Sequence, residues 1–152
     1  MPVEQTMKLM NSIDLGDLNA VTVPSPASHH ECMVCGQYDS LGLRFRTFEN
    51  GVEALIQASP KWQGYQGFLH GGMISTLLDA AMTHCLFDLG IEAMTAELKI
   101  RFLQPAPCSK LLTLRACLLD TRHHLYFLSA ELSCASVLLA QANARFMQRK
   151  SS

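Results

Sequence analysis

Charged residues are scarce in this sequence. Asp, Glu, Lys and Arg make up 16% of its 152 residues, against about 25% in an average globular domain. The charges nearly cancel, with a formal net charge of -1 at pH 7. A non-specific nucleic-acid binder needs a basic face, and intrinsic disorder needs low hydrophobicity with high net charge. With 49% hydrophobic residues, the chain is expected to form one compact domain that binds no nucleic acid.

Long apolar runs and a targeting segment are also missing. No stretch approaches the roughly 20 apolar residues of a membrane span, so we expect no membrane contact. The N-terminal residues contain no basic segment followed by an apolar one, which predicts no signal peptide. Several of the six cysteines lie within apolar segments, as reduced thiols do. These features favour a cytoplasmic protein.

Hydrophobic periodicity predicts a single α+β domain at residues 29–150, after a leader at 1–28 that is partly helical or irregular. Apolar and polar residues alternate at 41–48 and again at 52–58, with a tight-turn signal between the two runs. This pattern indicates a β-hairpin at the start of the domain.

One long helix is expected from His70 to about Leu89. Its apolar side chains recur at helical spacing and surround it on nearly every side, which is typical of a buried helix. Four strand patterns with short connections follow, at 94–102, 110–120, 124–134 and 136–147. The predicted fold is an antiparallel sheet of about six strands wrapped around one long central helix. Because one sheet cannot cover every side of such a helix, we expect a second subunit to cover the rest.

Asp79 lies in the middle of this helix, in a stretch with no Lys or Arg between Lys61 and Lys99. No cation in the helix can pair with it, so burial would be unfavourable unless a neighbour compensates. Hydrogen bonds from the hydroxyls nearby on the helix would make Asp79 structural. Without them, a carboxylate in this position is a candidate catalytic base. The sequence leaves both interpretations open, the hydroxyls being those of Ser75, Thr76 and Thr83.

His70, Gly71 and Gly72 stand at the start of the same helix. The first N–H groups of a helix have no internal acceptor, and glycine lets another group approach the backbone closely. With the helix dipole behind them, these amides suit a developing oxyanion. A tight turn from loop to helix would explain the two glycines equally well.

The segment from His70 to Met82, HGGMISTLLDAAM, resembles the signature of hotdog-fold acyl-CoA thioesterases. The resemblance is to the phenylacetate-degradation-type branch of the 4-hydroxybenzoyl-CoA thioesterase superfamily, in which His-Gly-Gly opens the central helix and an acidic residue follows nine positions after the His. Thr95 and Phe102–Pro105 continue the match, and Cys32–Gly36 resembles the lead-in of some members. The similarity covers roughly residues 30–148.

The resemblance implies an enzyme that hydrolyses acyl-CoA to a free acid and CoA, with no cofactor beyond the CoA of its substrate. Asp79 would act as general base or nucleophile, the Gly71 amide would polarise the thioester carbonyl, and Thr95 would help to orient the water. The site would lie between two subunits of a homodimer, or within a dimer of dimers. Residues expected to line the substrate site are His70, Gly72, Gln63, Gln66, Phe68, Met73 and Arg122.

Two of these assignments depend on the resemblance alone. By strand alternation Thr95 shares the polar face of its strand with Glu97, which predicts that it faces solvent. Some relatives have Asn six residues before the His, where this chain has Gly64. Gln63 or Gln66 would then have to supply that side-chain amide.

A metal site and a phosphate site are further hypotheses. Cys32 and Cys35, with His29 or His30, are zinc-ligand types. A structural zinc site usually takes four ligands as two spaced pairs, and the later cysteines form no second pair, so a metal-free loop is the preferred interpretation. The CoA phosphates would need cations, for which the sequence offers Arg122, Lys110, Arg145, Arg149 and Lys150.

Two other functions fit some of the same features. One is a non-catalytic acyl-CoA binder or sensor, against which the combination of Asp79 with both glycines argues. The other is a hotdog dehydratase or hydratase, whose paired His and acidic residue are not found here. The acyl group is not readable from the sequence, although apolar residues near the expected site suggest an apolar pocket: Trp62, Tyr65, Phe68, Leu69 and Met73.

Overall fold

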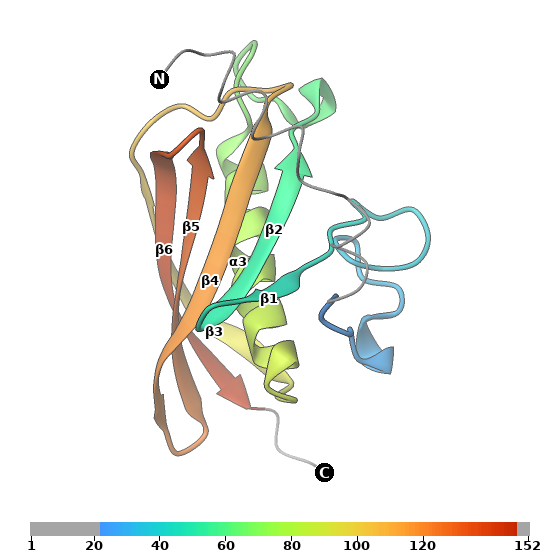
Figure 1. Cartoon of the computed structure of the whole chain (residues 1–152), viewed down its shortest axis with the longest axis vertical. Helices are drawn as coiled ribbons and strands as arrows, with labels where there is room; N and C mark the ends of the chain where they lie inside the picture. The colour runs from blue at the N-terminus through green and yellow to red at the C-terminus, as the bar shows by residue number, and fades with distance from the viewer. Residues whose placement is uncertain (1–21, 149–152) are drawn as a thin grey trace.

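The computed structural model describes residues 22–148. Six antiparallel strands, in the order β1-β2-β4-β5-β6-β3, form one sheet that curves around the long helix α3 (Figure 1). The elements are η1 (Ala27–His29), β1 (Arg46–Phe48), β2 (Gly51–Gln57), η2 (Pro60–Trp62), α3 (Gly71–Asp88), β3 (Ala93–Phe102), β4 (Leu111–Arg122), β5 (Leu125–Cys134) and β6 (Val137–Gln148). The predicted order of elements, the antiparallel pairing and the central helix are confirmed. None of the described helices combines the length and the hydropathy that crossing a bilayer requires.

Helix α3 begins and ends close to the predicted residues. His70 caps its N-terminus, where Nδ1 accepts the N–H of Gly72 at 2.8 Å. At the other end Gly90 has a φ of 74°, a left-handed conformation that glycine adopts without strain. Ten of the 18 helix residues are buried. The helix is therefore a core element, as its nearly uniform hydrophobicity predicts.

Strand alternation is clearest in β4 and β5, which lie in the middle of the sheet. The buried side chains of these two strands are Leu112, Leu114, Ala116, Tyr126, Leu128, Ala130 and Leu132. The turn between them lies slightly later than predicted, because β4 continues to Arg122 and the chain reverses at His123, which has a φ of 57°.

Only the last part of the first predicted strand, residues 46–48, pairs with the sheet. Alternation from residue 41 to 48 predicts one continuous strand, but β1 comprises Arg46–Phe48. The backbone N–H groups of Leu41 and Leu43 donate to the carbonyls of Met33 and Val34, each at 3.0 Å. An extended backbone bonded to a loop keeps the alternation of buried residues without joining the sheet. Its pairing partner is therefore the loop at residues 33–34.

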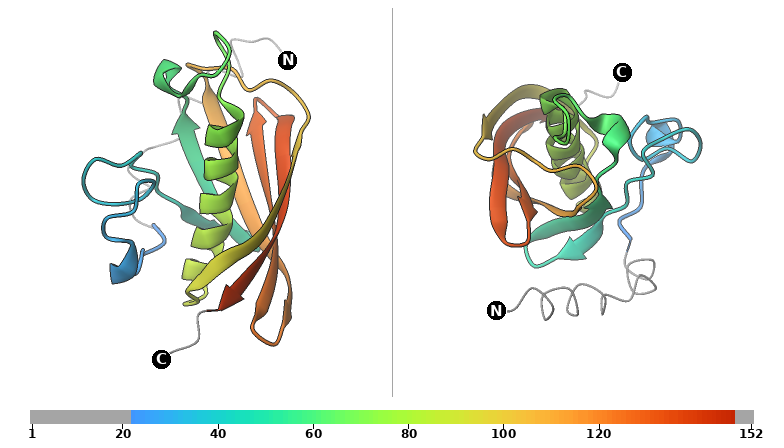
Figure 2. Two further views of the ribbon diagram at one scale, coloured as in Figure 1. Left: turned by 180° about the vertical axis from the view of Figure 1, so that it is seen from behind. Right: turned by 90° about the horizontal axis from the view of Figure 1, so that it is seen from above.

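Residues 22–45, here named the covering segment, lie beside the C-terminal half of α3 (Figure 2). Val23 and Phe45 are buried in the core, and the Phe45 ring stacks on the His84 ring of α3 with centroids 4.5 Å apart. The packed domain therefore includes residues upstream of the boundary expected at residue 29. The rest of the predicted leader, residues 1–21, lies outside the described residues.

Candidate functional site

Asp79 lies in the half-buried polar stripe of α3 and is bonded to another element of the fold. The hydroxyl of Thr95 on β3 donates to Oδ1 of Asp79 at 2.6 Å. The hydroxyls of its own helix donate to backbone carbonyls of α3 instead, the donors being Ser75, Thr76 and Thr83. No ion pair within residues 22–148 involves Asp79. Its carboxylate is therefore oriented by one hydroxyl and not neutralised by a cation of the described chain.

A β-bulge explains how Thr95 reaches the helix. In the pairing of β3 with β6, Thr95 lies opposite Phe146 and Glu97 lies opposite Arg145, so the register shifts at Ala96. The extra residue turns Thr95 to the face of the buried Phe146 ring, while Glu97 stays on the outer face and pairs with Arg145 at 2.6 Å. The expectation that Thr95 shares the face of Glu97 is therefore wrong, although Thr95 is exposed to solvent as the sequence predicts.

The N-terminus of α3 presents one backbone amide without an internal partner. The Gly72 N–H is engaged by the His70 imidazole at 2.8 Å, so Gly72 does not offer its amide to a substrate in this arrangement. The Gly71 N–H bonds to no other residue within 22–148, as expected for the first residue of a helix. The aromatic ring of Phe102 lies beside Gly71, 3.7 Å from where a Cβ would stand.

Gly71 and Asp79 are too far apart to act on one carbonyl within a single chain. They are eight residues apart on α3, which corresponds to about 12 Å along the helix axis. A base and an oxyanion donor must each approach the reacting group to about 3 Å. One chain therefore presents two half-sites on the same helix, the Asp79–Thr95 pair and the Gly71 amide.

The loop before α3 contains the glutamine and aromatic residues predicted to line the substrate site. Gln63 is engaged structurally, because its Oε1 accepts the N–H of Gly67 at 3.1 Å. Gln66 and Phe68 are exposed, and Met73 in the first turn of α3 is half-buried. A Cβ at Gly64 would lie 3.2 Å from Cα of His70. This close packing gives a structural reason for glycine where some relatives have Asn.

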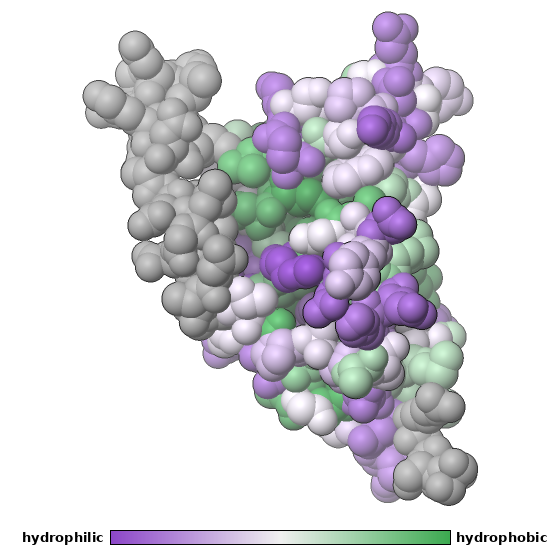
Figure 3. Space-filling model, turned by 90° about the vertical axis from the view of Figure 1, so that its right-hand side faces the viewer, coloured by the Kyte–Doolittle hydropathy of each residue, from purple (hydrophilic) through white to green (hydrophobic). Residues whose placement is uncertain are grey.

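A groove of about 390 Å³ lies between the covering segment and β2. Its lining includes Leu41, Phe45, Ile56 and Trp62, and does not include Asp79, Gly71 or Thr95. On the face shown in Figure 3, hydrophobic residues gather in a hollow. The predicted apolar residue Trp62 therefore lines a groove that is separate from both half-sites.

The cations predicted for the CoA phosphates do not gather near Asp79 within one chain. Arg122 lies on β4, which β5 and β6 separate from β3, and its Nε donates to Asp120 at 3.0 Å. Arg145 is paired with Glu97 on the outer face of the sheet. Lys110 is exposed, and Arg149 and Lys150 lie outside the described residues.

A buried histidine of α3, His84, lies beneath the covering segment, and the sequence pattern does not predict its hydrogen bonds. Its Nδ1 lies 2.8 Å from the carbonyl of Ala80, and its Nε2 lies 3.5 Å from the Ser25 hydroxyl. Because a carbonyl only accepts, Nδ1 carries the proton. Burial lowers the pKa of His84 to about 4, so the ring is neutral at pH 7. The helical spacing of His84 predicts burial but not these partners.

Comparison with known proteins places the central part of the chain in one family. Residues 66–140, which include α3, match the family model described as thioesterase superfamily. Acyl-coenzyme A thioesterase THEM4 of Bos taurus is 40% identical over 79 residues, covering 49% of this chain and 32% of that protein. The same protein of Mus musculus is 30% identical over 116 residues, covering 72% of this chain and 50% of that protein. The chain thus spans half or less of the length of these relatives.

Solved structures of thioesterase superfamily proteins share the fold. One such protein superposes with a TM-score of 0.72 at 20% identity, covering 96% of this chain and 78% of that chain. The Escherichia coli PaaI protein, from the phenylacetic acid degradation operon, gives a TM-score of 0.66 at 18% identity, covering 71% of this chain and 84% of that chain. From the six-stranded sheet around α3, the match over residues 66–140 and these neighbours, the chain is a hotdog-fold member of the thioesterase superfamily.

Proposed function

We propose that this protein hydrolyses acyl-CoA thioesters to a free acid and CoA. The curated relatives that it matches are named acyl-coenzyme A thioesterases, although it spans half or less of their length. The observation that carries the proposal is the Asp79 carboxylate, oriented at 2.6 Å by Thr95 and unpaired with any cation in the described chain. An oriented carboxylate in a half-buried position is suited to accept a proton from water or to attack a carbonyl carbon.

The two carboxylate oxygens of Asp79 have different roles in the proposed reaction. Thr95 occupies Oδ1, which leaves Oδ2 to take the proton of a water as the water oxygen attacks the thioester carbonyl carbon. The Thr95 oxygen keeps lone pairs that can accept a hydrogen bond from the same water. If Asp79 attacks directly, Thr95 instead holds the nucleophile in place, and water then hydrolyses the acyl–aspartyl anhydride that forms, which releases the acid and regenerates the carboxylate. In both routes the C–S bond breaks, and the CoA sulfur leaves and takes up a proton.

The negative charge that forms on the carbonyl oxygen needs a donor, and the Gly71 amide is the free one at the head of α3. Because Gly71 and Asp79 of one chain are about 12 Å apart, the proposed site combines Asp79 of one subunit with Gly71 of another. Strand β3 lies at an edge of the sheet, and most of its ten residues are exposed. This edge next to both half-sites suits pairing with a second copy.

The proposal is tested by turnover of a panel of acyl-CoAs with different chain lengths and aryl groups, following CoA release with a thiol reagent. The Asp79→Ala variant should fold and keep its oligomeric state while losing about 10²–10⁴-fold in kcat. Asp88→Ala is the matched control, since Asp88 is an exposed carboxylate at the end of the same helix. Wild-type turnover by Asp79→Ala would show that the carboxylate is structural. Binding of acyl-CoA by the wild type without CoA release would instead identify a non-catalytic binder.

A further inference from the structure

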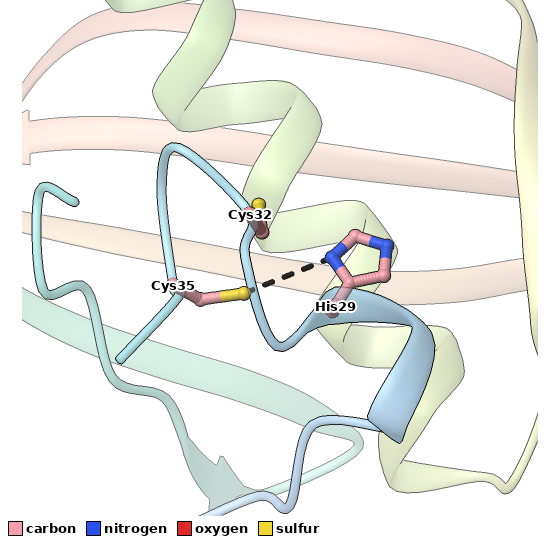
Figure 4. A group of neighbouring side chains, drawn as sticks. All are labelled: His29, Cys32 and Cys35. Carbon is pink, nitrogen blue, oxygen red and sulfur yellow. Dashed lines mark hydrogen bonds between the residues drawn. The ribbon is translucent and has the colours of Figure 1, made fainter. Parts of the chain in front are cut away.

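Three metal-ligating side chains converge in the covering segment, away from Asp79 and Gly71. Nδ1 of His29 lies 3.8 Å from Sγ of Cys35, and the ligand atoms of His29, Cys32 and Cys35 all lie within 4.8 Å of one another. In Figure 4 the Cys35 thiol points toward the His29 ring, which projects from the end of η1. The exposed His30, the other histidine that the sequence offers, is not part of this group.

The separation of the Cys35 and His29 ligand atoms is close to that of two ligands on a tetrahedral zinc ion. With Zn–S bonds of about 2.3 Å and Zn–N bonds of about 2.0–2.1 Å, a sulfur and a nitrogen on one tetrahedral zinc lie roughly 3.6 Å apart. The 3.8 Å between Cys35 Sγ and His29 Nδ1 is close to that value. The three atoms could thus reach one metal ion with small side-chain movements.

Both sulfurs already accept hydrogen bonds from other groups of the covering segment. The Val34 N–H lies 3.4 Å from Sγ of Cys32, and the Ser25 hydroxyl donates to Sγ of Cys35 at 3.8 Å. Arg44 brings its guanidinium close, donating to the carbonyl of Cys35 at 2.9 Å. The two donors fix the direction of the sulfurs, and the Arg44 bond fixes the backbone that carries Cys35.

The backbone of the turn at residues 32–36 is closely packed. The Gly36 N–H donates to the carbonyl of Cys32 at 2.8 Å, and a Cβ at Gly36 would lie 2.5 Å from that carbonyl oxygen. Any other residue would force the turn open, so glycine is required here. The result is a closed Cys-x-x-Cys-Gly turn whose two cysteines come from one rigid piece of backbone.

We propose that His29, Cys32 and Cys35 bind one Zn²⁺, with a water as fourth ligand, and that this ion fixes the part of the covering segment that packs against α3. Two thiolates and an imidazole select zinc over magnesium or calcium, which prefer oxygen ligands. The His29 ring contacts the Phe87 ring of α3 edge-on, with centroids 4.7 Å apart, so an ion on His29 would fix the orientation of a ring that packs against the helix. Phe87 lies eight residues beyond Asp79 on α3, and the zinc site is independent of thioester hydrolysis.

Metal analysis of the full chain, purified without chelator or added thiol-reactive metal, tests the proposal. After the protein is stripped and titrated with Zn²⁺, we expect about one zinc per chain. Titration with Co²⁺ should produce the charge-transfer absorption of thiolate ligands. Cys35→Ser and His29→Gln should each lose at least tenfold in zinc affinity, while His30→Gln and Cys134→Ser keep the wild-type affinity. Zinc should also raise the melting temperature of the wild type and not of His29→Gln.

Far-UV circular dichroism shows whether each variant is folded, and His29→Gln carries the test if Cys35→Ser is not. Three results would overturn the proposal. The stripped wild type could bind no Zn²⁺, His29→Gln could bind it as tightly as His30→Gln, or the reduced protein could form a Cys32–Cys35 disulfide in air even when zinc is present. None of these readouts uses CoA release, so they stand or fall separately from the proposed hydrolysis.

Discussion

The Thr95 hydroxyl is a direct test of how Asp79 is positioned, because it donates to Oδ1 at 2.6 Å. Thr95→Val keeps the branched shape of the side chain but removes the donor. A hydrogen bond to a charged group contributes about 1.5–3 kcal/mol, so kcat should fall about 10–100-fold with little change in KM. Thr95→Ser retains the hydroxyl and should recover most of the activity. Steady-state kinetics on acyl-CoA measures both, and an unchanged kcat in Thr95→Val would separate Thr95 from the chemistry.

The Gly71 amide can be removed without destroying the helix. Proline lacks the N–H but is tolerated at the first position of a helix. The preceding residue, His70, has a ψ of 137°, which suits a residue before proline. Gly71→Pro should therefore lower kcat about 10²–10³-fold, as the loss of an oxyanion donor does. Gly71→Ala keeps the amide, and its Cβ would stand 3.7 Å from the Phe102 ring, so it should stay active. Equal activity of the two variants would exclude this amide as the donor.

Among single residues, the sequence predicts which residues belong to the candidate site better than it predicts their hydrogen-bond and ion-pair partners. Asp79 and the two glycines at the N-terminus of α3 could be predicted because they lie at a fixed spacing within one helix. Glu53 is not, since strand alternation places it on the face opposite Val52 and Ala54, yet it is 3% exposed. Arg46 and Arg115 bond to its two oxygens, at 2.5 and 2.6 Å. Arg115 lies 62 residues further along the chain, so this buried network depends on sheet pairing that no local pattern reports.

Most of the secondary-structure elements could be predicted from periodicity, because β2, β4, β5 and β6 bury side chains in the core and α3 is apolar on nearly every face. The bulge at Ala96 could not, since it changes the register of β3 against β6 by one residue without altering the alternating sequence. That shift turns Thr95 toward Asp79, so simple alternation gives the wrong face for a site residue. The covering segment could not be predicted either, because Leu41 and Leu43 have the alternation of strand residues while their backbone N–H groups bond to the loop at residues 33–34.

His84 joins α3 to the covering segment and should make that contact pH-dependent. Burial lowers the pKa of His84 from 6.5 to about 4, the hydrogen bond to the Ala80 carbonyl opposes this effect, and the nearby His29 and Arg44 charges lower the pKa further. The unfolded chain then binds more protons between these two pH values, so protonation favours unfolding. The stability contributed by a neutral His84 is complete above about pH 6.5 and is lost as the pH falls to about 4, by up to about 3 kcal/mol.

Urea unfolding at several pH values between 7 and 4 measures this effect. The wild type should lose more stability across the window than His84→Leu, in which no imidazole has to stay neutral. His124→Gln is the control, because His124 is exposed in the turn between β4 and β5. Parallel pH curves for the wild type and His84→Leu would mean that His84 is protonated in the folded state without cost.

At the scale of the whole molecule, the chain itself covers part of the apolar surface that its low charge content implies. Part of the helix surface for which we expected a partner is covered by residues 22–45 of the same chain. What stays open is the edge formed by β3 and the polar stripe of α3, with exposed apolar side chains at Met94, Phe102 and Leu103. A long edge strand with apolar neighbours is a site of association unless something pairs with it. We therefore expect the second subunit at this edge and not around the whole helix.

If the site is shared between subunits, two inactive variants should complement each other. In a mixed dimer of Asp79→Asn and Gly71→Pro chains, one site carries both substitutions and the other carries neither. Random pairing makes half of the dimers mixed, so co-expression should restore about a quarter of the wild-type sites. Differently tagged chains allow the mixed dimer to be isolated, and analytical ultracentrifugation at micromolar concentration checks that the wild type is at least dimeric. If each chain held a complete site, the mixture would stay as inactive as its parts, and a stable monomer would contradict the shared site directly.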